Sequence, residues 1–281
     1  MKPETLKLLF VLAHPDDETF GAGGTIALYT RRGVAVHLVC ATRGEVGEAP
    51  PGYRGYASIA EMREAELKCA AEVLGLDAVH FLGYRDSGMA GSPDNSHPRA
   101  LAAADTATVA REIARYLREF RPHVVVTFDP IGGYLHPDHI ATHHATVRAF
   151  HLAADAREEI GGLPAHRAQK LYYLTFSRRF LRAVIRALRL FGRDPRKFGT
   201  NQDVDITKIA EHDFPIHATI SVGSAADVKA KAIACHASQA AGFGGIGRLL
   251  QRMIAGSETY MRAIPETPPA RMERDLFEGI K

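Results

Sequence analysis

The sequence lacks the cysteine content of a disulfide-stapled protein or of a thiolate metal site. Its 281 residues include only three cysteines, Cys40, Cys69 and Cys235, which are odd in number, far apart and without a C-x-x-C pair. Neither a disulfide framework nor a thiolate zinc site fits this pattern, so we expect a reducing compartment.

Long apolar runs are also missing. The first apolar run in the chain, Leu8–Ala13, is too short for a signal peptide or a membrane span, and charged residues follow it at once. We therefore expect no transmembrane segment and a cytoplasmic location.

Several common catalytic motifs are absent. The chain has no Walker A motif and no G-x-S-x-G motif, which argues against nucleotide triphosphatase and serine hydrolase chemistry. Residues 242–247 fit G-x-G-x-x-G literally, but no predicted strand precedes them, so this segment does not indicate a dinucleotide site.

The elements that are present alternate between strand and helix. Short β-branched or apolar runs at residues 6–13, 34–41, 78–82 and 123–128 are separated by predicted helices at 22–32, 58–74 and 105–120. This alternation predicts an α/β fold, a Rossmann-like three-layer domain with a mostly parallel sheet and helices on both faces. We expect a catalytic core over residues 1–165, and a smaller C-terminal part over 166–281 that completes the fold and the substrate pocket.

The net charge of +3 is concentrated in one segment. Residues 178–197 hold seven arginines and one lysine against a single aspartate, a net charge of +7, and the rest of the chain carries −4. A basic amphipathic helix is predicted at about 178–191. Its apolar face could pack on the body or on a second subunit of a homo-oligomer, and the segment could also contact an anionic membrane or cover an anionic substrate. The global charge is too small to indicate nucleic acid binding.

A cluster of acids follows the first predicted strand. In His14–Glu18 (HPDDE) three carboxylates stand in a row, and they repel one another unless something positive holds them. His14 and Asp17 could bind one divalent metal ion and leave Asp16 free beside it. The alternative is an ordinary helix start, where the helix dipole favours acidic residues.

A second polar motif, Gly132–His139 (GGYLHPDH), follows the fourth predicted strand. Because ligands of such folds sit beyond the carboxyl ends of the strands, this motif should lie beside the first. His139 would then supply a third metal ligand, and His136 a cation over the reacting centre. A histidine-rich exposed helix start is the alternative.

Together, the HPDDE motif, Gly23-Gly24-Thr25 and the HPDH motif resemble the LmbE-like, or PIG-L, superfamily of metal-dependent N-deacetylases. The resemblance covers about residues 6–150 and resumes at Lys231–Gln239. It implies that His14, Asp17 and His139 hold Zn²⁺, with Fe²⁺ as the other candidate. It further implies roles for catalytic side chains: Asp16 as the general base toward the attacking water, His136 as an imidazolium that stabilises the oxyanion, Tyr134 as a mobile contact to the intermediate, and Asp138 as the group that orients His136.

The same resemblance implies substrate contacts. Arg63 is similar to an arginine that grips the polar part of the substrate, and Asp86 to an acid that binds sugar hydroxyls. Glu45, His236 and Gln239 are further candidates. Four of these substrate-contact candidates also have an ordinary structural interpretation. Arg63 could be a helix-surface residue, Asp86 a turn residue, and Glu45 and His236 structural partners of other side chains.

The leading hypothesis is a zinc hydrolase that removes the acetyl group from an N-acetylglucosamine-type sugar or glycoside, with a small molecule as its partner. The first alternative is an amidase that cleaves a larger amide, such as a sugar-thiol S-conjugate. A non-catalytic binding module and a nucleic-acid-binding protein are the remaining alternatives.

Overall fold

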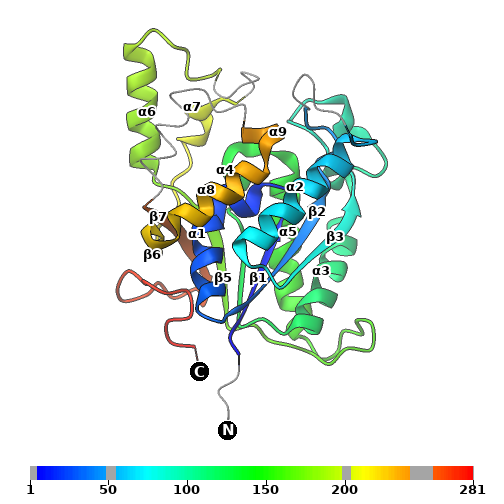
Figure 1. Ribbon diagram of the computed structural model, residues 1–281. Coiled ribbons are helices and arrows are strands. Elements are labelled where there is room, and N and C mark those ends of the chain that lie inside the picture. Colours follow the sequence, from blue (N-terminus) through cyan, green and yellow to red (C-terminus); the bar gives the residue numbers. More distant parts are fainter. Residues whose placement is uncertain (1–4, 49–54, 198–203, 241–255, 281) are drawn as a thin grey trace.

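The structure is a computed structural model that describes residues 5–48, 55–197, 204–240 and 256–280. Its centre is a seven-stranded sheet with the order β3-β2-β1-β4-β5-β7-β6 (Figure 1). The strands are β1 (Lys7–Leu12), β2 (Ala35–Thr42), β3 (Ala78–Tyr84), β4 (Val124–Phe128), β5 (Lys170–Thr175), β6 (Ala218–Ser221) and β7 (Ser257–Ile264).

Helices cover both faces of this sheet (Figure 1). The long helices are α1 (Asp17–Arg31), α2 (Ile59–Leu74), α3 (Thr106–Phe120), α5 (Pro137–Ala154), α6 (Arg178–Leu190) and α8 (Ala226–Cys235). The single-turn helices are α4 (Gly132–Leu135), α7 (Ile206–Ile209) and α9 (Ala237–Ala240). Short 3₁₀ turns add Pro93–Ser96, Leu101–Ala103 and Gly223–Ala225.

Strands β3, β2, β1, β4 and β5 run parallel, which confirms the predicted α/β fold with a mostly parallel sheet. β1 is apolar from Leu8 to Leu12, where both of its faces are covered. Leu8, Phe10 and Leu12 pack under α1, α2 and α8, whereas Leu9 and Val11 pack under α3 and α5. Parallel strands place their carboxyl ends at one edge, and the two polar motifs begin there.

The remaining strands, β6 and β7, were not expected from the sequence. β7 pairs antiparallel with both β5 and β6, so it lies between two strands that precede it in the chain. Glu258 of β7 also reaches α1, where its carboxylate accepts the backbone N–H groups of Gly24 (2.9 Å) and Thr25 (2.8 Å). A Cβ on Gly24 would lie 2.6 Å from the side chain of Val222, which explains the glycine at this close approach.

Helix α1 begins earlier than the sequence predicted, at Asp17 rather than residue 22. Its first turn includes Asp17 and Glu18, and acidic side chains are favoured there by the helix dipole. The acids therefore lie at a helix start, and this position is compatible with the proposed site.

The basic segment forms α6, at the margin of the molecule (Figure 1). Its apolar residues Leu181, Ile185 and Leu188 pack against Ile206 and Ile209 of α7 in a separate small cluster. This contact favours packing on the body of the protein over the other interpretations of the segment. Beyond this cluster, Leu190 and Phe191 are exposed.

The expectation that the cysteines form no disulfide was wrong. Cys69 of α2 and Cys235 of α8 are joined by a disulfide, with their Cα atoms 5.7 Å apart, and Cys40 is free and buried. The cause is tertiary packing, because α2 and α8 lie together on one face of the sheet although 166 residues separate the two cysteines. The inference of a reducing compartment loses its basis.

Within the described ranges, no helix combines the length and apolarity needed to cross a membrane. The glycine-rich segment 242–247 lies outside those ranges.

Arg118 of α3 is a buried residue that hydrogen-bonds the end of α5 and the segment that follows it. The residue is 3% exposed, and its guanidinium donates to five backbone carbonyls. These carbonyls belong to Leu152, Ala153, Asp155, Glu158 and Leu163. One side chain thus closes the end of α5 and the segment after it onto α3.

We expect Arg118→Ala to lower the free energy of unfolding by about 2–4 kcal/mol, because it removes several charge-assisted hydrogen bonds at once. Arg115→Ala is the matched control, since Arg115 lies on the same helix but is half exposed, pairs with Glu119 and stacks on Tyr116, for an expected loss below about 1 kcal/mol. Urea unfolding measures both. Equal losses would contradict the proposed role of Arg118.

Candidate metal centre and active site

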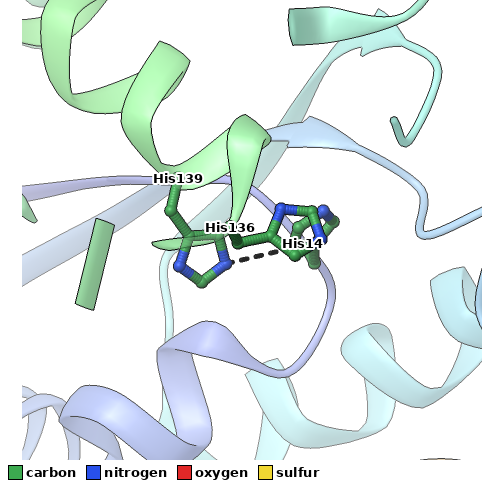
Figure 2. Close-up of side chains that lie close together, drawn as sticks. All are labelled: His14, His136 and His139. Atoms are coloured by element: carbon green, nitrogen blue, oxygen red, sulfur yellow. Dashed lines mark hydrogen bonds between the residues drawn. The ribbon is translucent and has the colours of Figure 1, made fainter. Parts of the chain in front are cut away.

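Turns after β1, β3 and β4 meet at the carboxyl edge of the sheet. His14 follows β1, Asp86 follows β3, and His136 and His139 lie at the start of α5 after β4. Figure 2 shows the rings of His14, His136 and His139 gathered in one place although they come from distant parts of the chain. All three are at least nine-tenths buried.

Three residues place possible ligand atoms at the spacing of a metal site. His14 Nδ1 lies 3.2 Å from His139 Nε2, which lies 3.3 Å from Asp17 Oδ1. His14 Nδ1 is 3.7 Å from Asp17 Oδ2. Tetrahedral ligands at metal bonds of about 2.0–2.1 Å stand about 3.3 Å apart, so this set fits Zn²⁺ or a similar divalent ion.

Neighbouring acceptors fix which nitrogen of each imidazole is free. His14 Nε2 lies 3.1 Å from Asp138 Oδ2, and His139 Nδ1 lies 3.1 Å from the carbonyl oxygen of Gly132. When these nitrogens carry the protons, the lone pairs on His14 Nδ1 and His139 Nε2 face each other. Such outer hydrogen bonds are the usual support of metal-binding histidines.

The charges at this cluster also favour a cation. Burial lowers the pKa of His14, but hydrogen bonds and charges from Asp138, Asp86 and Asp17 outweigh it and raise that pKa well above its ordinary value. Burial raises the pKa of Asp17, but the charges of His139 and His14 hold it far below its usual range. The carboxylates thus demand positive charge at the position that a metal ion would take.

His136 offers a second possible ligand. Donor atoms of His14, His136 and His139 all lie within 4.8 Å of one another. However, His136 is the N-cap of α5, and its Nδ1 accepts the backbone N–H of Asp138 at 3.1 Å. The neutral ring therefore carries its proton on Nε2.

The protonation of His136 departs from the imidazolium that the family resemblance implies. Burial and the charges of His14 and His139 lower the pKa of His136 to about 2. A neutral Nε2–H remains a hydrogen-bond donor, and a neutral imidazole can polarise a carbonyl oxygen.

Asp16 directly precedes Asp17 in the chain and is held by Arg63. Arg63 Nη2 donates to Asp16 Oδ2 at 3.0 Å and to the carbonyl oxygen of Pro15 at 2.6 Å. Burial, opposed by Arg63 and reinforced by the charge of Asp17, raises the pKa of Asp16 to about 6. A carboxylate of this pKa suits a proton acceptor near neutral pH.

The loop before α5 presents Tyr134 beside the histidines. The Tyr134 ring stands edge-on to the ring of His139, with centroids 4.8 Å apart, and Tyr134 is 36% exposed. Asp129 shapes the loop, because its Oδ1 accepts the backbone N–H of Gly133 at 2.8 Å. Gly132 has φ +62°, and a Cβ there would lie 2.6 Å from that of His139.

The candidate substrate contacts Arg63, Asp86 and Glu45 are already engaged in contacts within the protein. Arg63 is 5% exposed and is engaged with Asp16. Asp86 Oδ1 accepts the N–H of Gly88 and lies 3.5 Å from His14 Nε2. Glu45 accepts the backbone N–H of Asp86 at 3.0 Å.

The two C-terminal candidates differ in exposure. His236 is fully buried against Glu18, with its Nε2 2.8 Å from Glu18 Oε1. Gln239 is half-buried and donates to the Ser238 hydroxyl at 3.0 Å.

Sequence reasoning missed two residues that support the cluster. Ser87 donates its backbone N–H (2.9 Å) and its hydroxyl to Asp138, so Asp138 receives hydrogen bonds from both Ser87 and His14. In the sequence, Glu18 is the last residue of the acidic run in the HPDDE motif. Its place directly after two acids was a signal, since a third buried carboxylate needs its own partner.

Comparison with known proteins gives one family and one fold. The family described as PIG-L, GlcNAc-PI de-N-acetylase, matches residues 9–150. A 1D-myo-inositol 2-acetamido-2-deoxy-alpha-D-glucopyranoside deacetylase from Acidothermus cellulolyticus is 38% identical over 288 residues, which cover 97% of this chain and 94% of that protein.

Solved structures share the fold at lower identity. The N,N'-diacetylchitobiose deacetylase of Pyrococcus horikoshii matches with a TM-score of 0.64 and 20% identity, covering 92% of this chain and 84% of that one. GalB, the 4-carboxy-2-hydroxymuconate hydratase of Pseudomonas putida KT2440, also gives 0.64, with 22% identity and coverage of 96% and 100%. The hydratase shows that this fold alone does not decide the reaction. The motif resemblance is nevertheless confirmed by the family match over half of the chain and by the relative that matches nearly all of it: the protein belongs to the PIG-L family of de-N-acetylases.

Proposed function

We propose that this protein removes the acetyl group from the amide nitrogen of a 2-acetamido-2-deoxy-glucoside, at a metal ion held by His14, Asp17 and His139. The inositol glycoside named for the Acidothermus relative is the first substrate to test. One observation carries the proposal: the free lone pairs of His14 and His139 converge with the Asp17 carboxylate, directly beside Asp16.

Hydrolysis of an amide needs help at both reactants, because neutral water is a poor nucleophile and the amide carbonyl a poor electrophile. A divalent ion, Zn²⁺ first and Fe²⁺ second, supplies Lewis acidity to the carbonyl and makes a nearby water more acidic. Asp16 takes a proton from the attacking water and passes it to the sugar nitrogen as the C–N bond breaks. Acetate and the free amine are the products.

Two further side chains act on the developing oxyanion. His136 offers its neutral Nε2–H, because its Nδ1 is occupied by the backbone N–H of Asp138. Tyr134 lies beside His139 at the half-exposed rim, where its hydroxyl can follow the carbonyl oxygen. Donors aimed at such charge typically contribute about 10²–10³ in rate.

Substrate contacts follow from the same edge of the sheet. We propose that Asp86, Glu45 and Gln239 bind hydroxyls of the sugar and its aglycone, since a carboxylate accepts two hydroxyl donors well. Arg63 serves mainly to hold Asp16 in this arrangement, because its Nη2 already donates twice.

Asp138→Asn should weaken metal binding by about 10–100-fold, because Asp138 receives the Nε2–H of His14 and orients that ring. Competition with a chromogenic chelator measures the affinity for Zn²⁺. The control is His144→Ala, a histidine exposed on the same helix. Equal affinity in the Asp138 variant and the wild type would refute the assigned ligand geometry.

Asp16→Asn should retain the metal ion but lower kcat for acetate release by about 10²–10⁴-fold, because the proton acceptor is gone. Amine labelling and an acetate assay follow the two products, and elemental analysis follows the metal. Asp227→Asn, on the exposed side of α8, should keep the wild-type rate. Full activity of Asp16→Asn would contradict the proposed mechanism.

The acid that the wild-type protein releases tests the substrate class. Release of an acid larger than acetate from a conjugate would make the protein an amidase of another substrate class.

A further inference from the structure

Asp16 has an unusual backbone. Its φ is +130° with ψ −27°, a conformation that residues with a side chain rarely adopt. Such a backbone persists only where its surroundings hold it in place. The direction of the Asp16 carboxylate depends on this backbone, so the groups that hold it decide where the carboxylate points.

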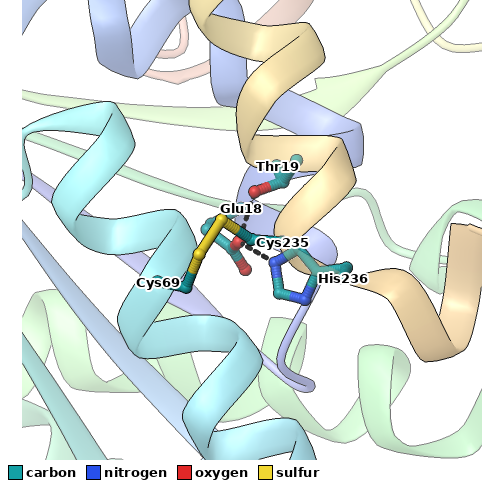
Figure 3. The surroundings of a disulfide bond; sticks show 5 residues. All are labelled: Glu18, Thr19, Cys69, Cys235 and His236. Carbon is teal, nitrogen blue, oxygen red and sulfur yellow. Dashed lines mark hydrogen bonds and ion pairs between the residues drawn. A yellow bond between two sulfur atoms is a disulfide. The ribbon is translucent and has the colours of Figure 1, made fainter.

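Glu18 is the side chain that reaches this backbone. Although it lies in the first turn of α1, its carboxylate turns back, and Oε2 accepts the N–H of Asp16 at 3.0 Å. The other oxygen, Oε1, accepts the Thr19 hydroxyl and faces His236 Nε2 at 2.8 Å (Figure 3). Glu18 and His236 are both 0% exposed, so water does not replace either contact.

His236 in turn depends on a covalent anchor. It directly follows Cys235, the last residue of α8, and Cys235 is bonded to Cys69 of α2. Figure 3 shows the disulfide beside the Glu18–His236 pair. Cys69 is an exposed residue of α2, so the disulfide lies near the surface of the protein.

We propose that Glu18 and His236 are positioning residues for Asp16, and that the Cys69–Cys235 disulfide secures them. The proposal rests on the proposed function, in which Asp16 moves the proton. The contacts run from the disulfide to His236, from His236 to Glu18, and from Glu18 to the Asp16 N–H. None of these groups touches the substrate. They act only through the orientation of one carboxylate.

Replacement of His236 tests the first link. His236→Ala should lower kcat by about 10–100-fold, the cost of a misplaced reacting group, with KM within about 2-fold of the wild type. His236→Gln keeps an N–H donor toward Glu18 and should recover most of the rate. Thr146→Val is the matched control, because Thr146 is also buried and its hydroxyl donates to the backbone carbonyl of Thr142 instead of a carboxylate of the site, so its kcat should stay at the wild-type level.

A double variant separates positioning from general damage. In the Asp16→Asn background, His236→Ala should change the residual rate by less than about 2-fold, because the two substitutions remove the same contribution. A crystal structure of His236→Ala should show the φ of Asp16 outside its positive range. Undiminished kcat in His236→Ala, or an equal loss in both backgrounds, overturns the proposal while leaving the deacetylase function intact. An inactive wild type with the inositol glycoside and with simpler 2-acetamido glucosides overturns both.

Reduction tests the covalent anchor. A dithiol such as dithiothreitol gives up two electrons and two protons, becomes a cyclic disulfide, and converts the bond between Cys69 and Cys235 into two thiols. Thiol titration of the denatured protein should then rise from one group to three. We expect reduction to lower kcat by about 3–10-fold, a weaker effect than removal of His236 itself.

The Cys69→Ser variant is the control for this arm. It should start at the reduced level of activity and not respond to dithiothreitol. If the wild type keeps its full kcat after titration has shown three thiols, the disulfide does not secure the positioning residues, and that part of the proposal fails.

Discussion

Five carboxylates, from Asp16, Asp17, Glu18, Asp86 and Asp138, gather below one edge of the sheet, where little water reaches them. Their mutual repulsion is the constraint on which the rest of the site depends. Buried charges of one sign are stable only when each has a partner of the other sign or a hydrogen-bond donor. The surrounding helices can be understood as the source of those partners.

Each partner comes from a different part of the chain. Arg63 of α2 pairs with Asp16, His139 of α5 faces Asp17, and His236 after α8 pairs with Glu18. His14 lies between Asp86 and Asp138. The charge balance therefore ties residues 14 to 236 into one unit around the converging ligand groups of His14, Asp17 and His139.

The sequence predicted the parallel part of the sheet and the meeting of the two motifs because both follow from short-range patterns. Apolar runs mark strands buried on both faces, and the carboxyl ends of parallel strands share an edge. The disulfide escaped prediction because it depends on how α2 and α8 pack. The Arg63–Asp16 and His236–Glu18 pairs escaped for the same reason, since spacing along the chain does not tell which buried carboxylate a distant cation will meet.

The position of β7 between β5 and β6 has a consequence for how the molecule is made. During synthesis from the N-terminus, β6 emerges before the strand to which it bonds, and β5 has an open edge until residues 257–264 have appeared. Glu258 reaches α1 only then, so the N–H groups of Gly24 and Thr25 lack this hydrogen-bond acceptor until the same segment has been made. The last quarter of the chain is therefore needed to complete the first helix, and a ribosome-bound intermediate that lacks it would expose an unpaired strand edge of the kind that aggregates.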